Sequence, residues 1–159
     1  MEQNPPPSSK KKSSAGLSLR AQALSLLARR EHSKRELARR LLQYTEDPDS
    51  IPPLIEEFEQ RGWLSEKRVV EQVMASRRRR FGTQKITQEL RQKGLSDDAI
   101  AGARESLKEG ELDAAREVWR RKFGTPPVDA RDKARQMRFL QGRGFGLDVI
   151  RRLLRGDEE

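Results

Sequence analysis

The sequence predicts an all-α protein made of tandem three-helix repeats, with three units and about nine helices in an elongated, curved array. Apolar residues recur at spacings of three and four from Leu17 onward, which is the helical period. No stretch alternates apolar and polar residues for long enough to form a strand. A Phe-Gly-Thr break occurs twice, each time after a basic helix end, which indicates internal repetition.

The composition favours small helical units with thin cores. Only 33% of the 159 residues are hydrophobic and 37% are charged, which suits units that stack on their neighbours better than one compact sphere. The absence of cysteine excludes disulfides, thiolate catalysis and cysteine-ligated zinc, and it fits a reducing, cytoplasmic location. Apolar runs of only a few residues predict no membrane span.

The two ends of the chain differ from the rest. Residues 1–16 are rich in Pro, Ser and Lys, so we expect a disordered basic tail and no secretory signal. Residues 156–159 form a short acidic tail. Between the tails we expect one three-helix repeat in each of three segments: residues 17–64, 65–109 and 110–155.

The first repeat begins with a helix over about residues 18–30, whose apolar face carries Leu24, Leu27 and Ala28. Ser33, with Glu36 three residues later, is the capping-box pattern and opens the second helix. The third helix has an apolar stripe at the spacing of a core-facing helix: Ile51, Leu54, Ile55 and Phe58.

The second and third repeats each begin with an amphipathic helix that ends in basic residues, over about residues 66–79 and 111–122. In the second repeat a short helix follows, and Ser96 caps the closing helix. Helices over about residues 129–141 and 147–154 complete the third repeat.

The second and third repeats contain matching motifs in the same order. Arg-Phe-Gly-Thr at residues 80–83 recurs as Lys-Phe-Gly-Thr at residues 122–125. A helix that ends in a glycine turn follows in both copies, so that residues 90–95 match residues 140–145. The larger spacing in the last copy predicts an insertion around residues 126–133, and the first repeat is more divergent.

At these motifs the sequence resembles the RecX family of bacterial regulators of the RecA recombinase. Four segments carry the resemblance: His-Ser-Lys-Arg-Glu-Leu at residues 32–37, and residues 56–64, 77–83 and 139–145. Their order and spacing together are specific, and the resemblance covers about residues 19–154. The family often has an acidic, tyrosine-containing segment in the first helix of the second repeat, whereas residues 65–71 of this chain contain fewer acidic residues and no tyrosine.

The resemblance implies binding along the helical groove of the RecA filament on single-stranded DNA. It also implies a regulatory protein of DNA repair, recombination and the SOS response, which mainly inhibits the ATPase, filament growth and strand exchange of RecA. The expected partners are the RecA filament and single- or double-stranded DNA, contacted without sequence preference. We expect a monomer with no membrane partner.

The charge predicts an anionic or acidic partner, since 34 Lys and Arg residues outnumber 25 Asp and Glu residues for a net charge of +9. The arginine run at residues 77–80 ends one helix, and residues 120–122 repeat the charge at the matched place. The alternative is a solvated run that only complements the helix dipole. The expected basic, partner-binding face consists of Arg77, Arg78, Arg79, Arg80, Lys85, Arg91, Lys93, Arg120, Arg121, Lys122, Arg138 and Arg143.

The aromatic residues are expected to serve packing. Trp63 and Trp119 are predicted to anchor the core between helices, and Phe81, Phe123 and Phe145 to staple the turns, so that Phe81→Ala costs stability more than binding. No aromatic residue alternates with the basic ones in the sequence. This favours contact with a nucleic-acid backbone or a protein over the reading of bases.

The sequence predicts no enzyme: no catalytic residue, no cofactor and no metal site. Its one histidine, His32, precedes an N-cap, and no second histidine or cysteine could complete a transition-metal site. The glycines at residues 142–146 open a helix without a preceding strand, which indicates a turn and not a nucleotide loop. The alternative function is a helical DNA-binding transcriptional regulator, or another nucleic-acid-binding helical protein.

Overall fold

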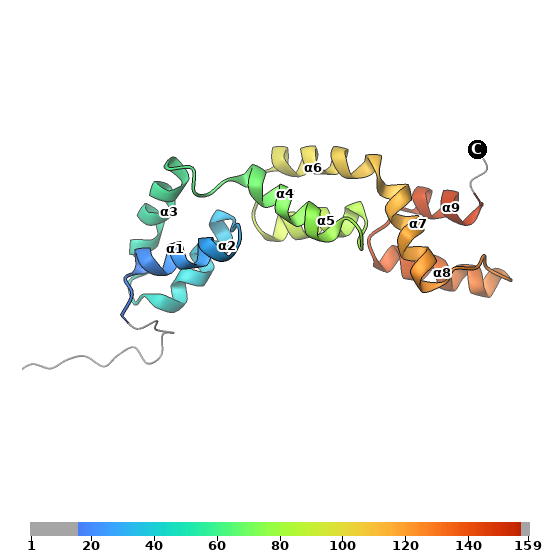
Figure 1. The fold of residues 1–159 in the computed structure, drawn as a ribbon, viewed down its shortest axis with the longest axis horizontal. Helices are drawn as coiled ribbons and strands as arrows, with labels where there is room; N and C mark the ends of the chain where they lie inside the picture. The colour runs from blue at the N-terminus through green and yellow to red at the C-terminus, as the bar shows by residue number, and fades with distance from the viewer. Residues whose placement is uncertain (1–15, 157–159) are drawn as a thin grey trace, which may run out of the picture. The chain divides into compact units, whose positions relative to one another are not determined.

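The computed structural model describes residues 16–156, and that part of the chain contains nine α-helices and no strand (Figure 1). The all-α prediction is confirmed. The two predicted tails lie outside the described residues, except for Gly16 and Gly156, and stay predictions. The chain divides into two compact units, and the boundary falls between Val69 and Val70 in helix α4. Each unit is described by itself.

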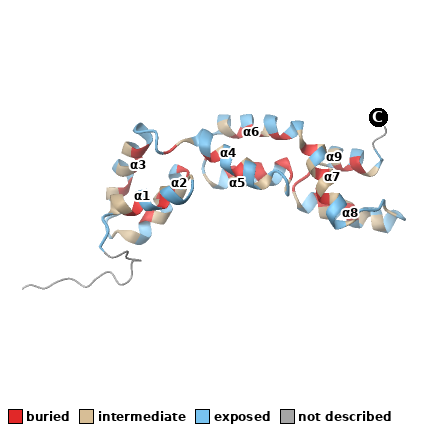
Figure 2. Cartoon of the chain, viewed as in Figure 1, coloured by how far each residue is buried: buried red, intermediate tan, exposed pale blue. Residues whose placement is uncertain are grey.

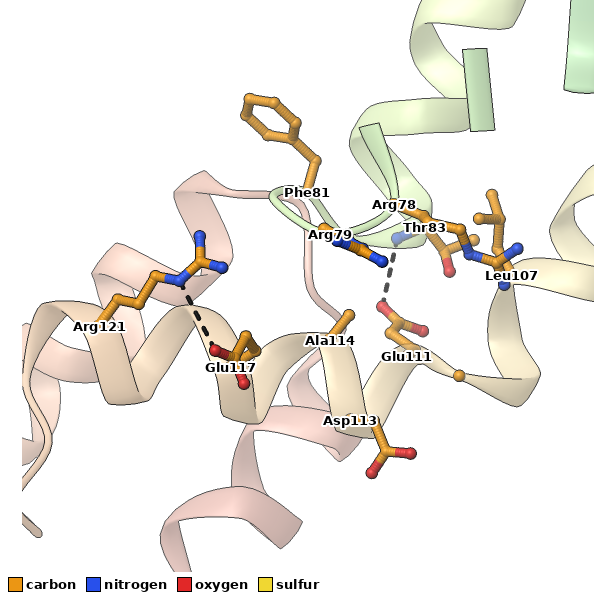
Figure 3. A pocket seen from close by; sticks show the side chains of 11 residues that line it. Arg78, Arg79, Phe81, Thr83, Leu107, Glu111, Asp113, Ala114, Glu117 and Arg121 are labelled. Atoms are coloured by element: carbon orange, nitrogen blue, oxygen red, sulfur yellow. Dashed lines mark hydrogen bonds and ion pairs between the residues drawn. The ribbon is translucent and has the colours of Figure 1, made fainter. Parts of the chain in front are cut away.

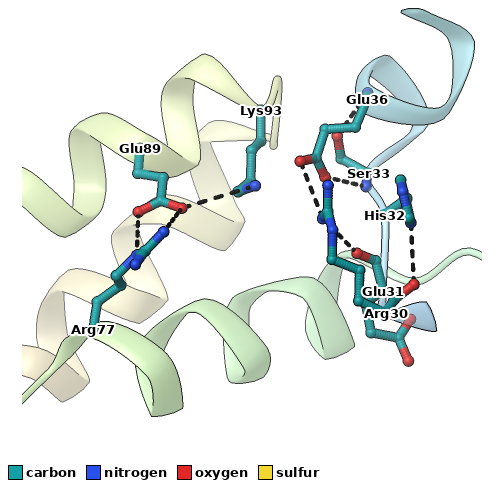
Figure 4. Close-up of polar contacts among 8 residues, drawn as sticks. All are labelled: Arg30, Glu31, His32, Ser33, Glu36, Arg77, Glu89 and Lys93. Atoms are coloured by element: carbon teal, nitrogen blue, oxygen red, sulfur yellow. Dashed lines mark hydrogen bonds and ion pairs between the residues drawn. The ribbon is translucent and has the colours of Figure 1, made fainter. Parts of the chain in front are cut away.

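The first unit contains three α-helices and two short 3-10 turns: α1 Leu19–Arg29, α2 Lys34–Leu41, 3-10 turns at Leu42–Tyr44 and Pro48–Ser50, and α3 Ile51–Gln60. Its core consists of residues that the helices turn toward one another (red in Figure 2): Ala23, Leu26, Leu37, Leu41, Ile51, Ile55, Phe58 and Leu64. The capping box at α2 is confirmed. The Ser33 Oγ accepts a bond from the Glu36 amide at 3.1 Å, and Glu36 Oε1 accepts one from the Ser33 amide at 2.9 Å (Figure 4).

Two details of the first unit differ from the sequence-based expectation. Helix α1 buries Ala23 and Leu26 and packs Leu27 against the core, whereas Leu24 is 39% exposed, so of the expected face only Leu27 contacts the core. Apolar residues occur almost all round this helix, and only the partners α2 and α3 select which of them is buried. Trp63 is not a core anchor, because it is 37% exposed and packs edge-on against Phe58, with ring centroids 5.1 Å apart.

His32 is buried in the first unit, with only 1% of its surface exposed. Its Nδ1 lies 3.0 Å from the carbonyl oxygen of Arg30, so Nδ1 carries the proton and donates it, while Nε2 is buried without a partner (Figure 4). Burial lowers the pKa of His32 below its ordinary value of 6.5, and the nearby charges of Arg30 and Arg40 lower it further. The folded unit therefore holds a neutral imidazole.

The stability of the first unit is expected to fall on acidification because of His32. The unfolded chain binds the proton more tightly, so this contribution is fully present above pH 6.5 and is lost as the pH falls through the lowered pKa of the folded state. The check is the urea midpoint between about pH 7.5 and pH 5.5, followed by Trp63 fluorescence in a Trp119→Phe background. His32→Asn keeps a donor for the Arg30 carbonyl and should remove the dependence. An equally steep curve for His32→Asn would contradict the assignment.

The second unit contains the rest of α4 and five further helices: α4 Glu66–Arg77, α5 Thr83–Gln92, α6 Asp97–Glu109, α7 Glu111–Lys122, α8 Ala130–Gly142 and α9 Leu147–Leu154. Helix α5 packs against α6, and α7 packs against both α8 and α9 (Figure 1). A buried layer lies between α7, α8 and α9: Ala115, Val118, Leu140, Phe145, Ile150 and Leu153. The loop between α7 and α8 contains the first half of the predicted insertion, residues 126–129, and the first turn of α8 contains the rest.

The repetition is visible in the hydrogen bonds of two turns. After α5 the Leu95 amide donates to the Leu90 carbonyl, and after α8 the Phe145 amide donates to the Leu140 carbonyl. In both turns the preceding glycine has a left-handed φ, +81° and +94°, which side chains other than glycine rarely adopt. The two sequence segments matched as repeats therefore form the same helix-ending turn, with an apolar residue that folds back into the core.

Candidate partner-binding surface

The structure separates the arginine run into side chains with different roles. Arg77 is half-buried, and its Nε lies 3.0 Å from Glu89 Oε1 on α5, so it ties α4 to α5 (Figure 4). The Lys93 ammonium lies 3.8 Å from the other oxygen of the same carboxylate. These two predicted partner-binding residues are thus engaged within the second unit.

Arg78 and Arg79 lie beside a pocket of about 440 Å³ between the end of α4 and the first turns of α7 (Figure 3). Leu107, Gly110 and Ala114 contribute apolar surface to it. The pocket lining is Arg78, Arg79, Phe81, Thr83, Leu107, Gly110, Glu111, Asp113, Ala114, Glu117 and Arg121. One buried polar atom on this wall, the Oγ1 of Thr83, has no hydrogen-bond partner. The pocket therefore combines apolar surface with unused hydrogen-bonding capacity.

The carboxylates around this pocket pair with arginines other than Arg78 and Arg79. Glu117 pairs with Arg120 at 2.8 Å and with Arg121 at 3.6 Å, and Asp113 pairs with Arg116 at 3.0 Å. Within residues 16–156, Arg78 and Arg79 form no ion pair and remain exposed. Two exposed guanidinium groups side by side repel each other, and a bound carboxylate or phosphate would relieve that repulsion.

Glu111 is a buried carboxylate, only 8% exposed, that caps two helices at once. Its Oε2 accepts bonds from the Thr83 amide at 3.4 Å, at the start of α5, and from the Gly146 amide at 3.3 Å, at the start of α9. The N-cap residues of both helices are glycines, which have no side chain for the purpose. A carboxylate at a helix N-terminus is also favoured by the helix dipole. Glu111 thus joins the second and third helix triplets.

Glu111→Gln is expected to destabilise the second unit by about 2 kcal/mol, since it removes the charge that two helix starts share. The measurement is urea unfolding followed by Trp119 fluorescence in a Trp63→Phe background. Asp113→Asn is the matched control, because this carboxylate is 87% exposed and its loss should cost at most about 0.5 kcal/mol. Equal shifts for the two variants would show that Glu111 has no special role.

A direct backbone contact joins the break before α5 to the turn before α9. The Gly82 amide donates to the Arg143 carbonyl at 2.8 Å, and the Gln84 amide donates to the Gly144 carbonyl at 3.1 Å. Arg143 Nη1 donates in return to the Arg80 carbonyl at 3.1 Å. We call this set of contacts the 82/144 junction. It explains why both Gly82 and Gly144 must be glycine, because a Cβ on either residue would lie within about 2.5 Å of the opposite segment.

A cluster of cations and aromatic rings covers the 82/144 junction. The Arg143 guanidinium lies 5.4 Å from the ring centre of Phe81 and 5.1 Å from that of Phe139. Lys122 lies 5.3 Å from the Phe139 centre, and Arg80 lies 5.8 Å from the Phe81 centre. The cluster contradicts the expectation that no aromatic residue interleaves with the charges, because Phe139 comes from another helix. Phe81 is half-buried at the turn that follows α4, and its predicted role as a turn staple stays a prediction.

The remaining predicted residues are dispersed. Lys85 donates to the Gly142 carbonyl at 3.2 Å and lies 5.7 Å from the Phe81 ring centre, which places it at the junction. Arg91 lines a separate pocket that also contains carboxylates. Arg138 is exposed on α8 and, within the described residues, forms no ion pair. The structure therefore brings together two groups, Arg78 with Arg79 and the cluster at the junction. Arg121 lines a pocket beside each group, and Arg91 and Arg138 lie apart.

The fold and the surface define a class of protein: a helical-repeat protein with a basic surface. Comparison with known families supports the helical repeats. The second three-helix domain of RecX matches residues 65–103, and the third matches residues 109–154. The chain is 50% identical to the regulatory protein RecX of Leptothrix cholodnii over 139 residues, which cover 87% of this chain and 88% of the relative. It is 44% identical to the regulatory protein RecX of Chromobacterium violaceum, over 89% of this chain and 91% of the relative.

The chain belongs to the RecX family of regulatory proteins. Solved structures agree in fold. A crystal structure of regulatory protein RecX superposes with a TM-score of 0.71 at 18% identity, over 85% of this chain and 72% of that chain. RecX from Lactobacillus salivarius gives a TM-score of 0.67 at 18% identity, over 87% of this chain and 94% of that chain. The prediction of tandem three-helix repeats is confirmed.

No helix within residues 16–156 is both long and apolar enough to cross a membrane. In the same residues no three His, Cys, Asp or Glu side chains come together in a way that could hold a metal ion.

Proposed function

We propose that this protein binds the RecA filament on single-stranded DNA and inhibits its ATP hydrolysis, filament growth and strand exchange. Membership of the RecX family supports a regulatory role. The surface is proposed from Arg78 and Arg79, which form no ion pair with any residue in the described part of the chain and lie beside a pocket with apolar walls. A protein partner that inserts an acidic side chain would satisfy the guanidinium groups and cover the apolar surface together.

Inhibition by this surface requires binding and no bond chemistry. A chain of several helix triplets can contact more than one subunit of a polymer, and contacts that are individually weak combine through effective concentration. A bound protein then holds neighbouring subunits in one arrangement and blocks access for a second DNA. We further propose that it acts as a cytoplasmic monomer, with repeats at residues 17–64, 65–109 and 110–155.

The test is to add the full-length protein, below the molar amount of RecA, to RecA filaments on single-stranded DNA. ATP hydrolysis should slow, and filaments seen by electron microscopy should shorten. In a pull-down, RecA should be retained with single-stranded DNA and a non-hydrolysable ATP analogue, and much less without them. Unchanged hydrolysis and filament length at low salt would refute the proposal, as would tight binding to one duplex sequence without RecA.

A further inference from the structure

The pocket beside Arg78 contains a buried hydroxyl group that has no partner in the described part of the chain. Thr83, the first residue of α5, is only 6% exposed, and its Oγ1 makes no hydrogen bond within residues 16–156. Figure 3 shows this side chain on the pocket wall, next to Arg78 and Glu111. Burying a polar group without a partner costs stability, and a molecule bound in the pocket can supply the partner.

The charge that this pocket leaves uncompensated is positive. Each of the three carboxylates in the lining has partners: Glu111 has the two amide groups that it caps, and Asp113 and Glu117 have arginines of α7. Arg78 and Arg79 form no ion pair within the described residues. Two guanidinium groups near each other favour an anion that carries more than one negative charge.

The set of donors fits a phosphate better than a carboxylate. The guanidinium groups belong to the turn after α4, and the Thr83 hydroxyl belongs to the first residue of α5. A phosphate monoester has three terminal oxygens and a charge of about −1.5 to −2 at neutral pH, so it can accept hydrogen bonds from all three groups. A carboxylate has two oxygens and one charge, so it leaves one of the groups without a full partner.

The other walls fit an apolar group attached to that phosphate. Leu107, Gly110 and Ala114 supply apolar surface. The volume of about 440 Å³ lies within the range of pockets for small molecules, about 300–1,000 Å³. No Asn, Gln or His side chain of the described residues lines the pocket, so specific hydrogen bonds to the edge of a base are not expected.

We propose that this pocket binds a small organic phosphate monoester. The phosphate lies between Arg78, Arg79 and the Thr83 hydroxyl, and the apolar body of the ligand lies against Leu107 and Ala114. Such a ligand occupies the surface that the proposed function assigns to RecA, so it should relieve the inhibition of RecA. This regulatory consequence rests on the proposed function, whereas the binding site itself does not.

The probe is phenyl phosphate, titrated into the full-length protein with isotope-labelled methyl groups of leucine and alanine. At about pH 7.5 the probe is a dianion, and the NMR signals of the Leu107 and Ala114 methyl groups should shift and saturate. Inorganic phosphate lacks the ring and benzoate lacks the phosphate, so each should bind about 10-fold more weakly. Equal affinity for phenyl phosphate and benzoate would overturn the phosphate assignment. The absence of a saturable shift would overturn the site.

Thr83→Val separates binding from structure, because it removes the unpaired hydroxyl and keeps the branched shape. Its affinity for phenyl phosphate should fall about 10-fold, while its Tm should equal or exceed that of the unaltered protein. The matched control is Thr87→Val. The Thr87 hydroxyl donates to the carbonyls of Thr83 and Gln84, at 3.0 and 3.2 Å, and lies outside the lining of this pocket. The control should bind within about twofold of the unaltered protein, and equal affinities for the two variants would overturn the role of Thr83.

The regulatory consequence is measured separately, by RecA-catalysed ATP hydrolysis on single-stranded DNA. Phenyl phosphate at about 10 times its dissociation constant should raise the concentration of this protein needed for inhibition about 10-fold, as competition requires. Hydrolysis by RecA alone with the same phenyl phosphate is the control. Binding without this relief would refute the RecA-binding surface at the pocket and support the phosphate site. If the unaltered protein does not inhibit RecA, the proposed function fails, and the methyl titration still decides the site.

Discussion

Gly82→Ala should destabilise the second unit by about 3 kcal/mol, which corresponds to a Tm lower by roughly 10–20 °C. A Cβ on Gly82 would lie 2.5 Å from the Phe145 amide nitrogen and closer still to the Gly144 carbonyl oxygen. These are backbone atoms that cannot rotate aside, so the 82/144 junction must open. Opening it breaks the bond from the Gly82 amide to the Arg143 carbonyl and moves Thr83 away from Glu111.

The matched control for this variant is Gly102→Ala. Gly102 lies in the middle of α6, and a Cβ there meets no atom within 4 Å. Alanine has the higher helix propensity, so this variant should gain about 0.5–1 kcal/mol. Thermal unfolding of the second unit, followed by Trp119 fluorescence in a Trp63→Phe background, separates the two. A Gly82→Ala protein as stable as Gly102→Ala would show that the close approach at the junction is not formed in solution.

Arg78→Glu/Arg79→Glu should raise the concentration needed to inhibit RecA by about 100-fold, because two interfacial cations become repulsive. The reversal leaves Arg77 in place, since that side chain pairs with Glu89 and its loss would loosen α4 from α5. It also leaves Arg80, whose side chain belongs to the separate cluster at the junction. The measurement is RecA-catalysed ATP hydrolysis on single-stranded DNA, titrated with each variant.

The control for the effect of net charge is Arg131→Glu/Arg155→Glu, which changes the net charge by the same amount at exposed positions away from the pocket. This control should inhibit RecA within about threefold of the unaltered protein. Equal loss of inhibition in both variants would show that net charge alone steers the protein to the filament. Full inhibition by Arg78→Glu/Arg79→Glu would exclude the pocket from the interface.

The helices were predictable because their signals are local. Ser33 with Glu36, Ser96 before α6 and the glycine turns after α5 and α8 each act within a few residues of the chain. The buried face of α1 was not predictable in the same way. With apolar residues on most sides of that helix, the choice of Ala23 and Leu26 over Leu24 is made by the helices packed against it.

The basic residues of the surface could be named from the sequence, but the sequence did not show which of them form ion pairs within the protein and which stay exposed. Arg77 and Arg78 are neighbours in one run, yet only the first meets Glu89, twelve residues further on. Phe139 joins Lys122 and Arg143 through the packing of α7 and α8, which no spacing in the sequence reveals. The one local signal for the role of Glu111 is that Gly82 and Gly146 both stand where a helix usually has a capping side chain.

The double cap at Glu111 also fixes an order of assembly during translation. This carboxylate emerges from the ribosome 28 residues after Thr83, and its other partner, Gly146, follows 35 residues later. The Thr83 amide at the start of α5 therefore lacks this cap until α7 has been synthesised. Glu111 has both hydrogen-bond donors only after Gly146, at the start of α9, has been added. A premature stop codon after α7 would leave Glu111 with the Thr83 amide as its one remaining cap partner and would remove the 82/144 junction from the start of α5.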